Sequence, residues 1–242
     1  LDPAVLARLS AVPLFSRRPM QGNVSGRHPS PHRGSSVEFA EYRRYVQGDD
    51  LRRVDWRAFG RTERYYVKEF EADTNLRCCL VLDTSGSMAF GTEELTKIEY
   101  AKRLAATLAY LVVQQGDAVG LSCVAEGLVA DLPPRRNPAH LSTVFDVLEQ
   151  TVPEGKTQLV PILHELAESV AQRALIIIFS DFFMSPEELG DCFEHLRFRK
   201  HDISVFQLLD PIELSFEFNR PMRFLDMEGG PSVFADPTEI TD

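Results

Sequence analysis

Two apolar runs that each end on an aspartate constrain the fold of this chain more than any other feature. Residues 76–82 and residues 174–179 are almost wholly apolar, and they lead into Asp83 and into Ser180-Asp181. Strands that are apolar on both faces are typical of parallel sheets covered by helices on both sides. The two runs therefore predict neighbouring central strands of an α/β domain.

Helical patterns alternate with these strands along the chain. Thr96 and Glu99 form a capping box ahead of apolar residues that recur every three or four positions, and Gly116 stands where this helix should end. We expect further helices at residues 137–148, at 159–172 and after Ser185, further strands at 118–124, 128–130 and 203–209, and a closing hairpin of residues 222–227 and 232–235. Alternation of this kind predicts a mainly parallel central sheet with helices on both faces.

The first third of the chain has a different composition. Residues 2–9 have the pattern of a short capped helix, and residues 16–36 are rich in Gly, Pro, Ser, Arg and His, which predicts an extended loop. Residues 37–73 are denser in aromatic residues and arginine, and we expect them to pack on the main domain. We therefore divide the chain into an N-terminal extension, residues 1–75, and an α/β domain, residues 76–242.

Bulk composition narrows the class of protein. The 242 residues are 44% apolar and 26% charged, which is typical of soluble globular proteins, and the longest apolar stretch, residues 104–113, is too short to cross a bilayer. The four cysteines follow neither a zinc nor a disulfide spacing, so we expect buried, reduced thiols in a cytoplasmic protein. The net charge of -10 argues against general nucleic-acid binding, although residues 17–68 hold 12 Lys and Arg against 6 Asp and Glu.

The carboxyl ends of the two apolar strands should form the functional site. In open α/β sheets, ligand sites lie beyond these ends, because the loops there converge and helix N-termini point at them. Two serines follow the first strand at positions two and four after its aspartate, and a threonine precedes the helix predicted from residue 159. We expect five side chains to converge here: Asp83, Ser85, Ser87, Thr157 and Asp181.

Two carboxylates and three hydroxyls make a donor set of oxygen atoms only. Such a set suits Mg²⁺, Mn²⁺ or Ca²⁺, and it does not suit zinc or copper. Because Mg²⁺ usually keeps several exchangeable waters in its octahedral shell, an acidic side chain from a partner protein can complete the coordination. The donor set therefore predicts protein binding that depends on both a metal ion and a carboxylate.

The same residues resemble a known motif. The run Asp83-Thr84-Ser85-Gly86-Ser87, with Thr157 and Asp181, resembles the metal-ion-dependent adhesion site of von Willebrand factor A domains. A wider set of motifs resembles the bacterial family called domain of unknown function 58: Gly26-Arg27-His28, Arg33-Gly34, Glu38-Phe39, Tyr42-Arg43, Gly48-Asp49-Asp50, Arg53, Asp55-Trp56-Arg57, Lys68, Phe70-Glu71, Asp210-Pro211, Glu213 and Asp226-Met227-Glu228-Gly229.

This resemblance covers most of the chain, and it implies more than the residues alone establish. It implies a Rossmann-like von Willebrand factor A fold with an N-terminal extension and a C-terminal hairpin. It also implies a non-enzymatic role as a partner of MoxR-type AAA+ ATPases, which act like metal chelatases or chaperones. The client of such an ATPase is not implied.

Alternative interpretations of the site stay open. An aspartate at a strand end followed by small polar residues is also ordinary turn chemistry. Gly155-Lys156-Thr157 is similar to the end of a phosphate-binding P-loop, but Gln150 stands where that motif needs glycine. A metal-assisted phosphoesterase would use the same carboxylates, but Ser85 stands where such an enzyme would need a second aspartate as acid or base.

A third class of function is a nucleic-acid adaptor that uses the basic segment. Arginines there alternate with carboxylates, as Arg57 does with Asp55, and this alternation favours structural ion pairs. We interpret Trp56 as a packing anchor, and we assign no chemistry to the six histidines because they follow no metal-binding or catalytic spacing.

Overall fold

The computed structural model of the chain describes residues 4–5, 8, 27–29, 37–46, 54–73, 76–92, 95–215 and 220–235. The chain divides into two units, one of Ser16–Leu76 and one of Leu1–Phe15 with Arg77–Asp242. Among the described residues, no helix combines the length and the apolar character that crossing a bilayer requires.

A five-stranded sheet forms the centre of the larger unit. Its strands are β4 (Arg77–Asp83), β5 (Ala118–Val124), β6 (Leu128–Arg135), β7 (Leu175–Ser180) and β8 (Asp202–Gln207). They lie in the order β6-β5-β4-β7-β8, in which β6 alone is antiparallel to its neighbour. The two apolar runs are thus confirmed as neighbouring central strands, β4 and β7.

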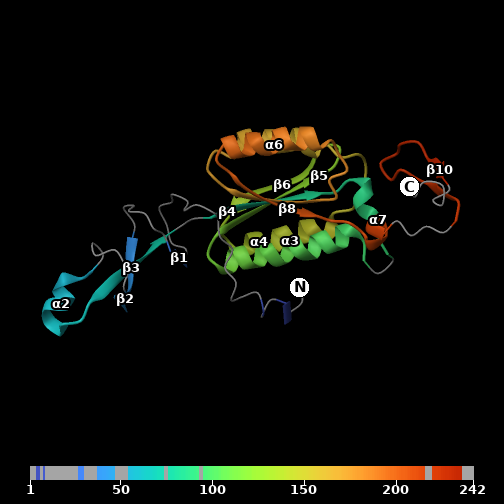
Figure 1. Ribbon diagram of the computed structural model, residues 1–242. Coiled ribbons are helices and arrows are strands. Elements are labelled where there is room, and N and C mark those ends of the chain that lie inside the picture. The colour runs from blue at the N-terminus through green and yellow to red at the C-terminus, as the bar shows by residue number, and fades with distance from the viewer. Residues whose placement is uncertain are drawn as a thin grey trace. The chain divides into compact units, whose positions relative to one another are not determined.

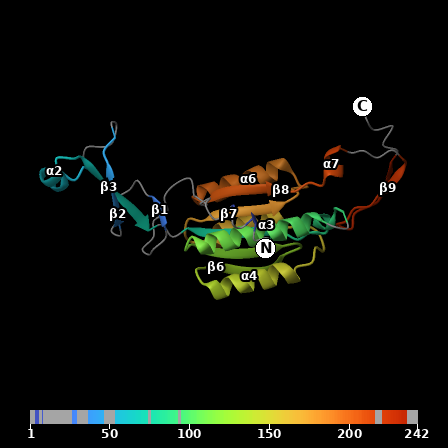
Figure 2. The ribbon, with the colours of Figure 1, turned by 90° about the horizontal axis from the view of Figure 1, so that it is seen from below.

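Helices cover both faces of this sheet (Figure 1). One face carries α3 (Lys97–Gln114) and α4 (Pro138–Gln150), and the other carries α5 (Leu159–Ser169) and α6 (Pro186–Phe198). Figure 2 looks onto the sheet from the side of α3, with β8 and β7 toward one edge of the sheet and β6 at the other. The predicted α/β class, a mainly parallel sheet with helices on both faces, is confirmed.

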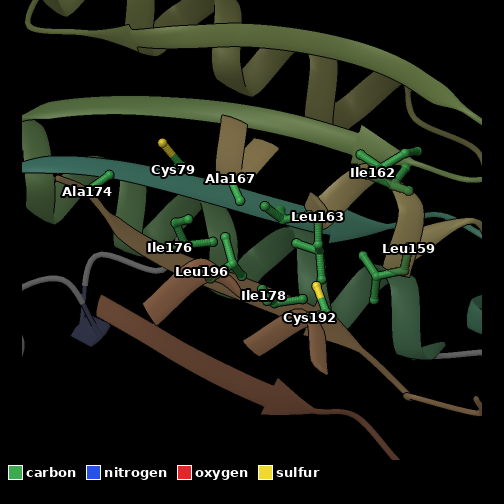
Figure 3. Close-up of a cluster of buried hydrophobic side chains, with 12 residues drawn as sticks. Cys79, Leu159, Ile162, Leu163, Ala167, Ala174, Ile176, Ile178, Cys192 and Leu196 are labelled. Atoms are coloured by element: carbon green, nitrogen blue, oxygen red, sulfur yellow. The ribbon is translucent and has the colours of Figure 1, made fainter. Parts of the chain in front are cut away.

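The apolar core beneath α5 and α6 follows from the alternation of side chains along a strand. Cys79 and Val81 of β4 point to the same face as Ile176 and Ile178 of β7, because residues two apart share a face. They meet the buried face of the two helices, formed by Leu159, Ile162, Leu163, Ala167, Cys192 and Leu196 (Figure 3). Intervening residues such as Leu80, which is fully buried, face α3 and α4. Both faces of β4 are therefore buried in apolar core.

Several boundaries differ from the prediction. β6 continues five residues past its predicted end at residue 130, through Pro133 and Pro134, because an edge strand tolerates residues without an N–H. α5 ends at Ser169 and not at residue 172. Two short helices of the larger unit were not predicted, the 3₁₀ helix η2 (Gly86–Ala89) and α7 (Pro211–Ser215). The predicted closing hairpin is confirmed as β9 (Met222–Phe224) and β10 (Val233–Ala235).

The smaller unit has an antiparallel sheet of its own. Its strands β1 (Arg27–Pro29), β2 (Val37–Arg44) and β3 (Tyr66–Asp73) lie in the order β1-β3-β2, with α2 (Trp56–Thr62) before β3. The prediction of a loop at residues 16–36 is wrong for β1. This strand pairs with β3, which is distant in the sequence, and such a pairing leaves no local sequence signal. Trp56 meets Phe59 and Tyr65 edge-on but is 59% exposed, so it is not a buried anchor.

Two expectations for the N-terminal part are not decided. Of the predicted helix at residues 2–9, Ala4, Val5 and Arg8 are helical, and the other residues lie outside the described part. The packing of residues 37–73 on the main domain stays a prediction.

The four cysteines are free and buried, as predicted. Burial raises the pKa of Cys79 to about 12 and that of Cys192 to about 11, and it also raises the pKa values of Cys78 and Cys123. Each change favours the neutral thiol, because a thiolate is poorly solvated in an apolar core.

We therefore expect the native protein not to react with a disulfide reagent such as DTNB at pH 8, because only an accessible thiolate attacks it. In guanidinium chloride, all four thiols should react, and the released chromophore measures their number. Rapid reaction of any thiol in the native protein would contradict the burial described here.

Candidate metal site

Asp83 ends the central strand β4, and its carboxylate is completely buried. Oδ1 accepts a hydrogen bond from the backbone N–H of Ser85 at 2.9 Å, and Oδ2 accepts one from the hydroxyl of Ser180 at 2.6 Å. Burial raises the pKa of Asp83, while these two residues act in the opposite direction as donors. Within the described part of the chain, no lysine, arginine or histidine forms an ion pair with this carboxylate.

Contacts between loops bring Thr157 to the same carboxylate. The N–H of Gly86 donates to the carbonyl of Gly155 at 2.8 Å, which holds the loop after β4 against the loop before α5. As a result, the hydroxyl of Thr157 lies 3.4 Å from Asp83 Oδ2. The hydroxyls of Ser85 and Ser87 are 3.2 Å apart in the same loop. Four of the five predicted site residues thus form one hydrogen-bonded group.

Asp181, the fifth predicted residue, has a different partner. Its Oδ2 lies 2.8 Å from the ammonium of Lys97, which also lies 2.9 Å from Oε1 of Glu213 in α7. The rings of Phe90 and Phe183 flank this ammonium, with centroids 5.7 and 4.9 Å from Nζ. Asp181 is close enough that its charge raises the pKa of Asp83. Asp181 therefore lies beside the group around Asp83, with one oxygen held by an internal cation.

The residues around Asp83 fit a divalent metal ion. A buried carboxylate without a counter-charge is unfavourable, and a dication at the surrounding hydroxyls would supply that charge. Asp83, Ser85, Ser87, Thr157 and Asp181 offer only oxygen atoms, which is the set that Mg²⁺, Mn²⁺ and Ca²⁺ prefer. In the described residues, no group of three or more His, Cys, Asp and Glu could hold a metal by itself. The hydroxyls are therefore essential to any such site.

The structure adds two residues that sequence reasoning missed. Ser180 lies opposite Asp83 because Leu82 pairs with Phe179 in the parallel register of β4 and β7. Lys97 lies in the first turn of α3, where the helix macrodipole disfavours a cation. A lysine at this unfavourable position is a signal in the sequence, because nearby carboxylates would compensate for it.

The turn between β9 and β10 also reaches these loops. Oε2 of Glu228 accepts a hydrogen bond from the backbone N–H of Thr157 at 3.4 Å. The carbonyl oxygen of Met227 lies so close to Gly86 that a Cβ at position 86 would overlap it. Glycine at position 86 is therefore required by the approach of this turn.

Comparison with known proteins shows the family of the chain. The family model described as "Protein of unknown function DUF58" matches residues 41–238. This chain belongs to that family. The DUF58 chain is 27% identical over 233 residues to the uncharacterized protein Rv1480 of Mycobacterium tuberculosis, covering 95% of this chain and 73% of that protein.

Two solved structures show partial likeness to the DUF58 chain. The conserved hypothetical protein BatB from Bacteroides thetaiotaomicron matches with a TM-score of 0.49 and 19% identity, over 68% of this chain and 82% of that one. The VWA domain of SpRpn10 matches with a TM-score of 0.38 and 12% identity, over 55% of this chain and 73% of that one. The family assignment depends on the sequence match alone.

Replacing Lys97 tests the internal cation. We expect Lys97→Met to lower the free energy of unfolding by about 3–5 kcal/mol, because it leaves the buried Asp181 carboxylate without its partner. Lys102→Met is a matched control, since Lys102, whose side chain is 13% exposed, pairs within the same helix with Glu99, whose side chain is 47% exposed. This control should cost less than about 1 kcal/mol. Equal losses in urea denaturation would contradict the proposed role of Lys97.

Proposed function

We propose that this DUF58 chain is a non-enzymatic protein-interaction module that binds its partner through a metal ion held at Asp83. The observation that carries the proposal is a buried carboxylate that has no counter-cation among the described residues and is surrounded by hydroxyls at the carboxyl end of a mainly parallel sheet. A dication held there would supply positive charge at the surface of the protein. An acidic side chain of the partner is the natural ligand for that charge.

Mg²⁺ is the metal we propose, with Mn²⁺ or Ca²⁺ as alternatives that suit the same oxygen donors. Asp83, Ser85, Ser87 and Thr157 would hold the ion, and Asp181 would act from beside them. Mg²⁺ usually keeps several waters and binds through one or two carboxylates, so it leaves exchangeable positions for a partner.

The partner we propose is a MoxR-type AAA+ ATPase or its client. Support comes from the family motifs of the chain, which extend from the basic segment before residue 76 to the acidic turn after β9. Four free, buried thiols suit a reducing compartment, and we propose that the module acts in the cytoplasm.

A binding role suits the groups around Asp83 better than hydrolysis. Metal-assisted hydrolysis needs a general acid or base beside the metal. The side chains that hydrogen-bond to Asp83 in the described structure are serine and threonine hydroxyls, and Asp181, the carboxylate beside them, has one oxygen paired with Lys97. Turnover of p-nitrophenyl phosphate by the wild type and not by Asp181→Ala would support an enzyme in place of a binding module.

Metal binding is tested by thermal unfolding. Mg²⁺ or Mn²⁺ at 100 times its Kd should stabilise the wild type by about 2.7 kcal/mol, because the ion binds only the folded chain. We expect the metal-induced rise in Tm to vanish in Asp83→Ala. Asp146→Ala, which removes an exposed aspartate on α4, should keep the full rise. No shift of the wild type at millimolar metal would contradict the proposal.

Partner binding is tested by affinity capture with Mg²⁺ present. We expect the wild type and Asp146→Ala to retain AAA+ ATPase subunits, identified by mass spectrometry, and Asp83→Ala to lose them. Asp83→Ala is a better test than adding a chelator, because a chelator would also remove Mg²⁺ from the nucleotide site of an ATPase. Equal retention by Asp83→Ala would show that the metal site does not mediate the contact.

A further inference from the structure

The turn between β9 and β10 contains two acidic residues whose carboxylates have different partners. Asp226 Oδ1 accepts a hydrogen bond from the N–H of Glu228 at 2.8 Å, and the carbonyl of Asp226 accepts one from the N–H of Gly229. Gly229 has a φ of +84°, a backbone conformation that glycine adopts without strain. Asp226 therefore shapes the turn, and its carboxylate is used within it. Glu228 is left to face outward from the turn.

Glu228 faces the loop that carries Thr157. Its Oε2 accepts the hydrogen bond from the N–H of Thr157, whose own hydroxyl lies 3.4 Å from Asp83 Oδ2. The carbonyl oxygen of the preceding residue, Met227, lies directly against Gly86, between Ser85 and Ser87. The turn thus contacts both loops that carry the hydroxyls of the candidate site.

We propose that Glu228 is a further carboxylate ligand of this metal site, supplied by the chain itself at the position where a partner's acidic side chain would bind. The inference rests on the proposed function, since it assigns a ligand to the same metal. Glu228 would then compete with a partner's carboxylate for one coordination position of the metal, and the partner would bind when Glu228 leaves that position.

The distribution of charge supports this assignment. Lys97 is paired with Asp181 and Glu213, and in the described residues neither Asp83 nor Glu228 forms an ion pair. Asp83 approaches the hydroxyl of Thr157 and Glu228 approaches its backbone N–H, and like charges on either side of one residue repel each other unless a cation lies between them. A dication bound by both would remove that repulsion. Mg²⁺ is commonly held by one or two carboxylates in this way, together with waters.

A purely structural role for Glu228 makes a different prediction. A carboxylate near the start of α5 is favoured by the helix macrodipole, and its hydrogen bond to Thr157 would help to fix the turn. Glutamine at position 228 keeps a hydrogen-bond acceptor but loses the charge that a hard cation needs. Metal affinity, and not stability alone, therefore separates the two roles.

The test measures the affinity for Mg²⁺ and Mn²⁺ by calorimetric titration of the whole chain. We expect Glu228→Gln to bind at least about 10- to 100-fold more weakly than the wild type, because removing a mere outer-shell partner of a metal already costs that much. The matched control is Glu126→Gln, because Glu126 is exposed and its side chain lies beside Gly155 in the neighbouring loop. It should bind within about threefold of the wild type, as expected for an exposed charge in solvent.

Three results would overturn the inference. Wild-type affinity in Glu228→Gln would show that Glu228 does not ligate the metal, while the proposed function would stand. Equal losses in Glu228→Gln and Glu126→Gln would indicate a general charge effect. No metal binding by the wild type would contradict the proposed function, and the assignment of Glu228 with it.

Limited proteolysis gives a second readout that a structural role would not change. Leu225, at the start of the turn, is 70% exposed, and chymotrypsin accepts leucine before the bond that it cleaves. We expect Mg²⁺ to slow cleavage after Leu225 in the wild type and in Glu126→Gln, but not in Glu228→Gln, with fragments identified by mass spectrometry. Equal protection of all three proteins by Mg²⁺ would overturn the inference.

Discussion

The burial of the Asp83 carboxylate is the constraint on which the rest of the site depends. A charged oxygen at the end of a dry strand must have its lone pairs satisfied, and the neighbouring elements supply donors from three directions. The parallel register of β4 and β7 brings Ser180, the loop after β4 brings the N–H of Ser85, and the loop before α5 brings Thr157. Each donor comes from the carboxyl end of a strand or the start of a helix. The topology of the sheet therefore determines which donors surround Asp83.

Two positive charges would neutralise the carboxylates at this end of the sheet: the ammonium of Lys97 and the proposed metal ion. Lys97 neutralises Asp181 and ties α3 to α7 through Glu213. The group around Asp83 has no such residue in the described structure, and a metal would take that place. Under the proposed function, the chain would use a fixed cation at Asp181 and an exchangeable one at Asp83.

Much of the fold could be predicted from local signals. The apolar runs of β4 and β7 show burial on both faces, the capping box at Thr96 marks the start of α3, and four of the five predicted site residues form one group. The rest depended on contacts distant in sequence. β1 exists only through its pairing with β3, Lys97 has its role through Glu213, 116 residues away, and Glu228 reaches Thr157 from 71 residues away. Periodicity and composition do not describe such contacts.

The two prolines of β6 have a consequence for the behaviour of the molecule in a crowded solution. An outer strand offers unpaired N–H and C=O groups to any extended segment that meets it, and this is a common route to aggregation. Successive N–H groups along a strand point to opposite sides, so the pair Pro133 and Pro134 removes one donor from the open edge of the sheet. A foreign strand would find the ladder interrupted there. Strand addition is therefore disfavoured at this end of β6.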